Sequence, residues 1–489
     1  MSRTLPSQPG PVSARRSSAA AGSVPPDGTA ACARLLREPL DCSLTPAAAL
    51  TRLRGERLPF ALTGAWAGGG AIVGSDPVRV AADDEDPFGL LDELPPVEGR
   101  PAEQAVGGGW FGWLGYRLSA RVERVPLAPL RPATLPEFHL AYYDNVLRMD
   151  PQGRWWFEAL VTGERREALA ARRDHLARLL YDRAGRPATG RDDGQGPAAR
   201  SREPLTLRLS ADDAAHHVAA VAECTNRIAA GEIFQANLCV RLDGRFDGTA
   251  ADLLGAALAR VNPPYAAAFD TPRGSVASLS PELFLRRRGR EVVTGPIKGT
   301  IVRDEDPARA AAALARLTAS AKDAAEHVMI VDLMRNDLGR VCEYGSVVAP
   351  RVPTAEPHPG LWHLVSRVSG RLRAGIGDGR LLLATFPPGS VTGAPKVQSL
   401  KVIAALERHG REAYTGAIGF ASPIAGLELN VAIRTLELAG GRLWLGAGGG
   451  IVADSDPRRE LSEALAKARP IAAAVGGEVV VEAAPDDAG

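Results

Sequence analysis

The chain has 489 residues, of which 45% are apolar and 24% charged, a composition typical of a globular protein with one large or two to three ordinary domains. Its formal net charge of +1 at pH 7 argues against nucleic acid as the main partner, because a polyanion requires a basic surplus. No apolar run approaches the length of a membrane span, so we expect no membrane association.

Five cysteines are scattered along the chain, without the paired spacing of a metal site. This pattern predicts buried thiols in a reducing compartment, and we expect a cytoplasmic protein. They are Cys32, Cys42, Cys224, Cys239 and Cys342.

The amino-terminal part predicts a leader and a first domain. Residues 1–30 are rich in Ser, Ala, Pro and Arg, and Arg15-Arg16 is not followed by the apolar segment of an export signal, so we expect a disordered leader. Residues 31–189 contain short apolar runs broken by Gly and Pro, which predict a mainly antiparallel sheet and a helix near 165–182. The Gly-rich stretch within 190–204 predicts a linker.

The second half predicts a second domain over 205–475 and a tail over 476–489. Ser210 and Asp213 form a capping box at the start of a helix that ends near Gly231. The remaining expected elements are strands at 234–242, 277–287 and 291–293, a helix at 320–335, a hairpin of 428–438 with 443–452 turning at Gly440-Gly441, and a helix at 457–474. Clustered strands with helices between them predict an α+β fold.

Lysine is rare in this chain, because only five of the 58 basic residues are lysine and the rest are arginine. Only a primary amine can lose its proton and act as a nucleophile. Lys401 lies in a helical pattern and fits a solvated charge. Lys298 lies between chain-bending residues and apolar neighbours, so it is a candidate for a chemical role.

Two predicted helices each carry an acidic pair at i and i+3, so that both members share a face. Asp323 and Glu326 precede an apolar run, and Glu460 and Glu463 are followed one turn later by Lys467. Such a pair is usually a solvated helix face. Carboxylates near a core need a cation or protons, and ligands that are all oxygen favour Mg²⁺ over zinc.

A glycine-rich stretch, Leu445-Gly-Ala-Gly-Gly-Gly-Ile451, directly precedes the last predicted helix. Its spacing is not that of a dinucleotide-binding motif. It supplies either exposed backbone N–H groups for a carboxylate or a tight bend, and the motif does not separate these alternatives. Arg434, on the expected partner strand, is placed to grip the same anion.

Several motifs occur in order along the second half. They are Gly231-Glu-Ile-Phe-Gln235-Ala-Asn-Leu, Leu279-Ser-Pro-Glu282-Leu-Phe, Pro296-Ile-Lys298-Gly-Thr300, Ala321-Lys-Asp323-Ala-Ala-Glu326-His, Gly389-Ser-Val-Thr-Gly-Ala-Pro-Lys396, Ile433-Arg434-Thr435, the glycine-rich stretch and Glu460-x-x-Glu463. Together, over about 205–475, they closely resemble the chorismate-utilising enzymes, which include anthranilate, aminodeoxychorismate, isochorismate and salicylate synthases. The resemblance implies an anthranilate-synthase-like fold with antiparallel sheets and outer helices.

Two positions select a member of this family. Isochorismate and salicylate synthases carry a lysine base where this chain has Gln235, and anthranilate synthases resemble Pro-Ile-Ala-Gly-Thr where this chain has Lys298. The resemblance therefore points to the aminodeoxychorismate synthase component I group, on the route to 4-aminobenzoate and folate. Anthranilate or aminodeoxyisochorismate synthesis and a non-catalytic relative stay open as alternatives.

The resemblance also assigns roles to individual residues. It implies Lys298 as nucleophile and Glu282 as general acid. It implies Mg²⁺ held by Glu326 and Glu463 with Asp323 and Glu460 in support. The residues implied to bind chorismate are Gln235, Thr300, His363, Thr392, Tyr414, Arg434, Gly448, Gly449, Gly450 and Lys467.

No cysteine of the sequence lies in a Gly-x-Cys-x-Gly elbow, the signature expected of a glutaminase. The resemblance therefore implies that ammonia comes from the family's separate glutamine amidotransferase subunit.

Overall fold

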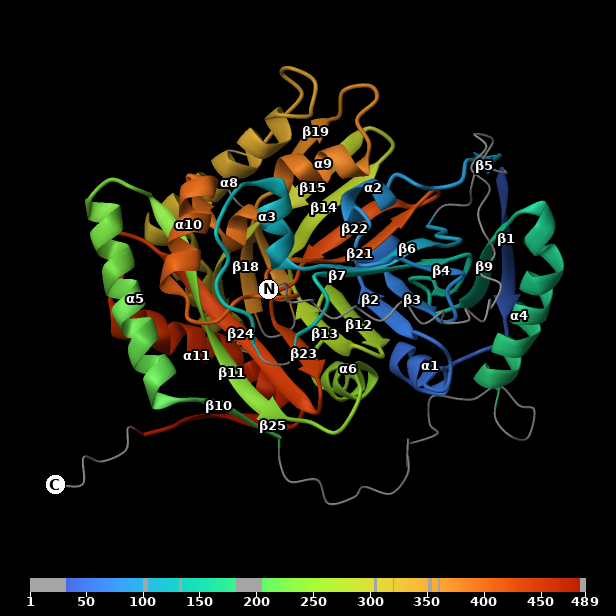
Figure 1. The fold of residues 1–489 in the computed structure, drawn as a ribbon, viewed down its shortest axis with the longest axis horizontal. Helices are drawn as coiled ribbons and strands as arrows, with labels where there is room; N and C mark the ends of the chain where they lie inside the picture. Colours follow the sequence, from blue (N-terminus) through green and yellow to red (C-terminus); the bar gives the residue numbers. More distant parts are fainter. Residues whose placement is uncertain are drawn as a thin grey trace, which may run out of the picture.

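The computed structural model describes residues 32–99, 104–131, 134–181, 205–302, 306–319, 321–350, 354–358 and 361–483. The expected leader (1–30) and linker (190–204) lie outside these residues. Within them, two large sheets with helices on their outer faces form the body of the protein, as Figure 1 shows. The predicted α+β class is confirmed.

The first sheet has 14 strands and contains strands from both halves of the chain. In spatial order these are β25 (Gly477–Val481), β10 (Leu205–Leu209), β11 (Gln235–Arg245), β24 (Arg442–Ile451), β23 (Thr435–Ala439), β13 (Gly274–Ser280), β12 (Tyr265–Thr271), β2 (Phe60–Gly64), β3 (Gly70–Gly74), β8 (Asn145–Met149), β9 (Trp155–Val161), β1 (Ala33–Leu40) and β5 (Val97–Glu98), with the short β20 (Gly393–Ala394) beside β11. Pairing is antiparallel except for β1 with β5 and β10 with β25.

The second sheet has eight strands, and a third has three. The second runs β19 (Val368–Arg371), β15 (Glu291–Gly295), β14 (Leu283–Arg288), β22 (Gly426–Val431), β21 (Ala417–Ser422), β6 (Gly109–Leu114), β7 (Phe138–Tyr143) and β4 (Arg79–Val80). The third consists of β16 (Ile297–Val302), β18 (Leu361–Val365) and β17 (Thr354–His358).

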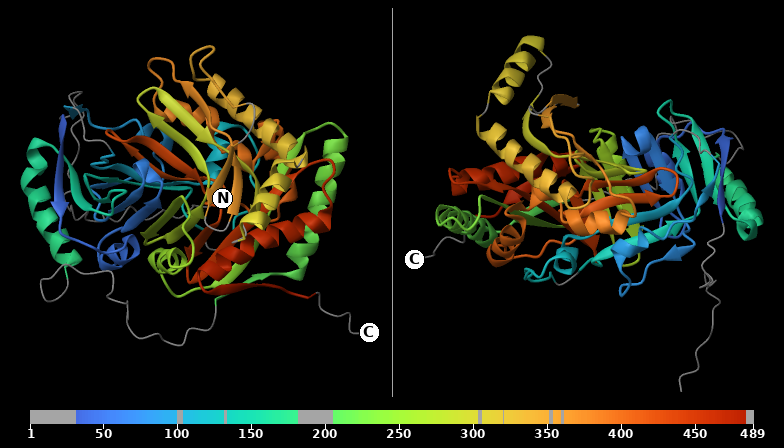
Figure 2. Two further views of the ribbon diagram at one scale, coloured as in Figure 1. Left: turned by 180° about the vertical axis from the view of Figure 1, so that it is seen from behind. Right: turned by 90° about the horizontal axis from the view of Figure 1, so that it is seen from above.

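The helices vary widely in length. They are α1 (Pro46–Arg52), α2 (Pro87–Leu90), α3 (Ser119–Val122), α4 (Arg166–Leu180), α5 (Ala211–Ala229), α6 (Ala250–Leu258), α7 (Pro307–Thr318), α8 (Ala321–Gly339), α9 (Asp378–Thr385), α10 (Lys396–Leu406) and α11 (Pro457–Ala474). Figure 2 shows α7 and α8, in yellow and gold, at one side of the body. No helix among the described residues is long and apolar enough to cross a membrane.

The halves on either side of the expected linker share both large sheets. β2 pairs with β12 in the first sheet, and β6 pairs with β21 in the second. A core that includes Phe60, Trp66, Phe111 and Phe420 contains side chains from both halves. The domain boundaries stay a prediction, but the two halves are packed through continuous hydrogen-bonded sheets.

Several predicted elements are confirmed. The last helix has the predicted bounds and begins after Asp456, whose carboxylate accepts a hydrogen bond from the Arg459 N–H. Ser210 caps α5 by accepting from the Asp213 N–H. The hairpin around Gly440-Gly441 is formed by β23 and β24, and both glycines have positive φ.

Two predicted strands were wrong in their extent. The segment 277–287 divides into β13 and β14, and 428–438 divides into β22 and β23. In each case the first part belongs to one large sheet and the second part to the other. The alternation that predicts a β-strand is the same in either sheet, so it does not indicate where a chain changes sheets.

Candidate active site

Glu282 and Arg434 lie at two of the points where the chain passes between the large sheets. Glu282 follows β13, and its carbonyl accepts a 3.0 Å hydrogen bond from the Val431 N–H at the end of β22. Arg434 precedes β23, and its carbonyl accepts a 2.9 Å bond from the Leu279 N–H. Arg434 was expected on a strand but lies in this connection with φ of 51°, a strained backbone of the kind found at functional sites.

Glu282 has the properties of a general acid at neutral pH. Its side chain is buried, and burial raises the pKa of this carboxyl from 4.5 to about 7. Hydrogen bonds from Ser390 and the Ile297 backbone, together with the charges of Lys298 and Arg434, oppose the rise. A pKa near the working pH lets one group both hold and release a proton.

Lys298 lies beside Glu282 on β16, next to an irregularity in the pairing of β16 with β18. The following Gly299 has φ of 78°, and a Cβ there would meet Leu317 at 3.0 Å, so this position favours glycine. Burial lowers the pKa of the Lys298 amine, although the charges of Glu326, Glu282 and Glu463 oppose this effect. Removal from water therefore favours the neutral, nucleophilic amine.

The two acidic pairs lie on α8 and α11, as predicted. Glu326 and Glu463 both act electrostatically on the Lys298 amine, which places carboxylates from the two helices around one point. Glu460 is buried and accepts a 2.7 Å hydrogen bond from Ser455, whereas Glu463 is exposed and pairs with Lys467 at 2.9 Å.

The donor chemistry at this point fits Mg²⁺, because every candidate ligand is a carboxylate. No group of three or more metal-binding side chains is assembled among the described residues, and the Asp323 side chain lies outside them. Of the carboxylates on α8 and α11, Glu326 and Glu463 are therefore the ones that act electrostatically on the Lys298 amine.

The glycine-rich stretch is a strand and not a tight bend. Gly448, Gly449 and Gly450 lie in β24, opposite Cys239, Leu238 and Asn237 of β11. The pairing of β24 with β23 ends at Leu445, so the edge of β24 beyond that residue does not face β23. This geometry favours the first alternative, backbone groups available to a ligand.

Two glycines of this strand, Gly449 and Gly450, lie against side chains of the predicted site. A Cβ on Gly449 would lie 3.4 Å from Glu460 Oε2 and from Lys467 Nζ, while one on Gly450 would lie 2.2 Å from Gln235 Nε2. Lys467 also donates a 2.9 Å hydrogen bond to the Gly448 carbonyl. The absence of side chains therefore lets polar groups approach the strand from both faces.

Gln235 is a buried amide with unused hydrogen-bonding capacity. Its side chain has no exposed surface, and among the described residues neither Nε2 nor Oε1 has a hydrogen-bond partner. An unpaired buried amide costs about 1–3 kcal/mol, so its retention indicates a ligand that completes it. Because Gln235 faces Gly450, this ligand would lie against the glycine strand.

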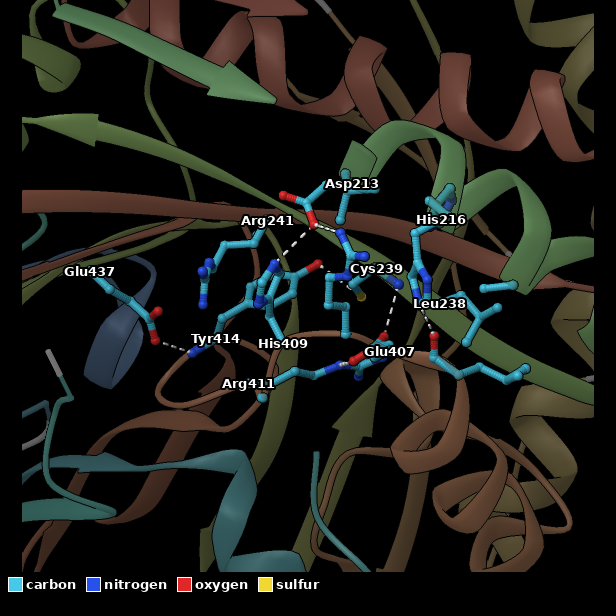
Figure 3. A pocket seen from close by; sticks show the side chains of 17 residues that line it. Asp213, His216, Leu238, Cys239, Arg241, Glu407, His409, Arg411, Tyr414 and Glu437 are labelled. Atoms are coloured by element: carbon cyan, nitrogen blue, oxygen red, sulfur yellow. Dashed lines mark hydrogen bonds and ion pairs between the residues drawn. The ribbon is translucent and has the colours of Figure 1, made fainter. Parts of the chain in front are cut away.

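The other predicted binding residues differ in their availability. Tyr414 is buried with its hydroxyl 3.5 Å from Cys239 Sγ, in the wall of the pocket shown in Figure 3. The Thr392 hydroxyl donates back to carbonyls of its own loop, Pro388 at 3.3 Å and Gly389 at 3.1 Å, which leaves it only as an acceptor. The side chains of Thr300 and His363 lie outside the described residues.

Sequence reasoning missed Ser390 and His327. Ser390 contacts the Glu282 carboxyl, and His327 Nε2 lies 2.6 Å from Ser366 Oγ, close to the strand that carries Lys298. Burial and the Lys298 charge lower the pKa of His327 to about 4, so this imidazole is neutral at pH 7. Both residues lie within the motifs quoted above, but their partners are distant in sequence.

Comparison with known proteins gives a consistent result. A model of the chorismate binding enzyme family matches residues 67–473. The chain is 35% identical to anthranilate synthase component 1 of Streptomyces coelicolor, over 90% of this chain and 88% of that protein. It is 33% identical to aminodeoxychorismate synthase component 1 of Escherichia coli K12, over 78% of this chain and 81% of that protein.

Solved structures show the same fold. Anthranilate synthase component I of Streptococcus pneumoniae superimposes with a TM-score of 0.69 at 25% identity, covering 92% of this chain and 94% of that one. The menaquinone-specific isochorismate synthase MenF of Escherichia coli superimposes with a TM-score of 0.68 at 19% identity, covering 91% and 95%. This second likeness concerns the fold alone.

Proposed function

The chain belongs to the chorismate binding enzyme family, and we propose that within this family it acts as an aminodeoxychorismate synthase component I. The observation that carries the proposal is a lysine, Lys298, whose pKa is lowered by burial and which lies beside a carboxyl, Glu282, whose pKa is raised to about 7. Burial thus favours the neutral form of both groups, which is the form that a nucleophilic amine and a proton-donating acid require. Aminodeoxychorismate synthase component 1 proteins are among its relatives.

In the first step, the neutral Lys298 amine attacks ring carbon C2 of chorismate. Both ring double bonds shift, from C1–C2 and C5–C6 to C1–C6 and C4–C5, the bond from C4 to its hydroxyl breaks, and Glu282 gives its proton to the leaving oxygen, which departs as water. Glu282 is thereby left as a carboxylate between Arg434 and Lys298, whose positive charges stabilise it.

In the second step, ammonia attacks C4 and displaces the lysine. A bond from C4 to nitrogen forms, both double bonds return to C1–C2 and C5–C6, and the bond between C2 and the Lys298 nitrogen breaks. The proton lost by the incoming ammonia returns to Glu282, so both residues regain their starting states. The product, 4-amino-4-deoxychorismate, is a precursor of 4-aminobenzoate and folate.

Binding of chorismate would use the groups that converge on the glycine strand. The Gln235 amide lies against Gly450, the Tyr414 ring against Gly446, and Lys467 against Gly449 and the Gly448 carbonyl, while Arg434 would add its guanidinium from beside Glu282. Glu326 and Glu463, with Asp323 and Glu460 in support, would hold Mg²⁺. When bound, this ion supplies positive charge to hold a substrate carboxylate.

Synthesis of anthranilate is the second candidate, because a component 1 of anthranilate synthase matches 90% of this chain at 35% identity. That reaction places ammonia at C2 and requires no lysine there. Under this alternative Lys298 would be an incidental substitution, and its position beside Glu282 would have no chemical use.

We also propose a separate glutamine amidotransferase as the source of ammonia. A glutaminase nucleophile needs a thiol with a lowered pKa. In this chain burial raises the pKa of Cys42, Cys224, Cys239 and Cys342, and for Cys239 it reaches about 11. We also propose that the protein is located in the cytoplasm.

The decisive experiment is product identification. The purified protein is incubated with chorismate, Mg²⁺ and an ammonium salt, and the products are separated and identified by mass and NMR. We expect 4-amino-4-deoxychorismate. Formation of anthranilate or of 2-amino-2-deoxyisochorismate as the main product would refute the proposal.

A further inference from the structure

A buried ion pair of Arg411 and Glu407, outside the reacting centre, connects three chain segments that carry residues of the candidate site. Arg411 is 5% exposed and donates to both carboxylate oxygens of Glu407, from Nε at 2.9 Å and from Nη2 at 2.6 Å. Its guanidinium also lies 4.8 Å from the centre of the Tyr116 ring. Such a two-pronged pair fixes a guanidinium in position and orientation.

The remaining donors of Arg411 reach three separate segments. Nη2 donates to the Asn237 carbonyl at 2.5 Å, while Nη1 donates to the Val391 carbonyl at 2.9 Å and lies 3.4 Å from Thr415 Oγ1. Each acceptor is adjacent or nearly adjacent to a residue of the site. Asn237 is two residues from Gln235 and opposite Gly450, Val391 lies between Ser390 and Thr392, and Thr415 follows Tyr414.

Glu407 extends the same network to the edge of β11. Its Oε1 accepts a 2.9 Å hydrogen bond from the Cys239 N–H. This position lies between the short pairings of β11 with β20, at Gln235 and Ala236, and with β10, at Asp243. The Glu407 carboxylate therefore accepts the backbone hydrogen bond that a neighbouring strand would otherwise accept from Cys239. The side chain of this same Cys239 contacts the Tyr414 hydroxyl.

The Tyr414 ring depends on this network because it is not tightly packed on every side. Beside it lies a pocket of about 40 Å³, lined by Cys239, Glu407, Arg411 and Gly446 among others (Figure 3). On another side the ring lies directly over Gly446, where a Cβ would come within 2.3 Å of the ring. The following Thr415 has φ of 63°, a strained backbone that surrounding contacts must maintain.

We propose that Arg411, oriented by Glu407, is a positioning residue for chorismate binding, and that it sets Gln235, Tyr414 and the Ser390–Thr392 loop relative to one another. This inference rests on the proposed function in one respect: it assumes that chorismate binds at the site described above. Its test follows the consumption of chorismate, whichever amino product forms. Loss of a single buried donor that spans three segments shifts groups that hold the substrate, and a misplacement of about 1 Å can cost about 10²-fold in catalysis.

The test compares Arg411→Lys with Arg148→Lys as a matched control. Arg148 is equally buried and donates to the carbonyls of Ala67, Gly69, Ala71, Gln104 and Met149. Lysine keeps the charge in both variants but has neither the planar fork nor the reach. Thermal unfolding and steady-state kinetics with saturating ammonium and Mg²⁺ are measured for both proteins and for the wild type.

We expect both variants to unfold at a lower temperature, and only Arg411→Lys to raise the KM for chorismate, by about tenfold or more, with kcat changed less than KM. Glu407→Gln retains an acceptor for the Cys239 N–H but loses the ion pair, so it should raise KM by a smaller factor. If Arg411→Lys does not fold, the KM of Glu407→Gln for chorismate is measured in its place.

A wild-type KM in folded Arg411→Lys, or in Glu407→Gln when it alone folds, would overturn the inference. An equal rise of KM in Arg148→Lys would also overturn it, because the effect would then reflect general destabilisation. A wild type that makes a 2-amino product would refute the proposed function and leave this comparison intact.

Discussion

Glu282 and Arg434 lie close enough to interact electrostatically, in the two connections that join β13 to β14 and β22 to β23. Two backbone hydrogen bonds link these connections to each other. The Glu282 carbonyl accepts from Val431, three residues before Arg434, and the Arg434 carbonyl accepts from Leu279, three residues before Glu282. The two side chains influence each other electrostatically, the guanidinium lowering the pKa of the carboxyl and the carboxylate raising that of the guanidinium. An acid and a cation are thus positioned by the crossing of the chain between sheets.

The raised pKa of Glu282 predicts a pH-dependent cost to stability. In the folded protein this carboxyl titrates near 7, whereas in an unfolded chain it titrates near 4.3. The folded state holds the extra proton between these values, so this group's contribution to stability falls as the pH rises from about 4.5 through 7. The cost above pH 7 is on the order of 3 kcal/mol, at 1.36 kcal/mol per pKa unit.

Glu282→Gln cannot ionise and should escape this cost. We expect the Tm of the variant minus that of the wild type, measured by thermal unfolding, to increase from pH 5 to about pH 7 and to level off at higher pH. Glu167→Gln, on an exposed position of α4, serves as the control and should give a difference that does not change with pH. A constant or decreasing difference for Glu282→Gln would contradict the raised pKa.

Elements with local signals could be predicted closely from the sequence. The last helix is bounded by Asp456 and Pro457 at its start and has a continuous apolar stripe, so its extent depends on neighbouring residues only. The cap of α5 by Ser210 is equally local. The acidic pairs could be predicted because i, i+3 spacing on a helix determines a shared face.

The arrangement of the site around these elements depends on contacts distant in sequence. Arg411 reaches Asn237, 174 residues away, and no periodicity encodes this contact. The unpaired state of the Gln235 amide is likewise a property of its surroundings. The change of sheet at Glu282 was missed because β-strand alternation is the same in either sheet.

Metal dependence should follow from the carboxylates on α8 and α11. We expect EDTA to abolish chorismate consumption and Mg²⁺ to restore it, and Mg²⁺ binding measured by calorimetry to weaken in Glu326→Gln and in Glu463→Gln. Asp332→Asn is the control, because Asp332 is an exposed α8 residue paired with Arg335. Full activity in EDTA would contradict the assignment of these carboxylates.

The source of nitrogen can be tested with the isolated chain. Because burial raises the pKa of four of its cysteines, we expect turnover with ammonium salts and none with glutamine. Addition of a cognate glutamine amidotransferase should confer use of glutamine, detected as glutamate formed together with the aminated product. Glutamine-dependent turnover by the pure chain alone would show that it contains a glutaminase.

Covalent catalysis by Lys298 makes the sharpest prediction. With chorismate and Mg²⁺ present but ammonia withheld, substrate should become attached to Lys298, which mass spectrometry of the digested protein can detect. Lys298→Arg retains a positive charge, but its guanidinium does not deprotonate in proteins, so formation of 4-amino-4-deoxychorismate should fall by at least about 10³-fold. Lys401→Arg, at an exposed position of α10, is the control and should retain wild-type activity.

Lys298→Ala tests the regiochemistry of the same step. Without the side chain, C2 becomes open to direct attack by ammonia, so residual turnover should shift towards 2-amino products. Products of the wild type and of the three variants are identified side by side by mass and NMR. If Lys298→Arg forms the 4-amino product at the wild-type rate, Lys298 is excluded as the nucleophile. The arginine that replaces it cannot attack C2, so the hydroxyl must then leave by another route.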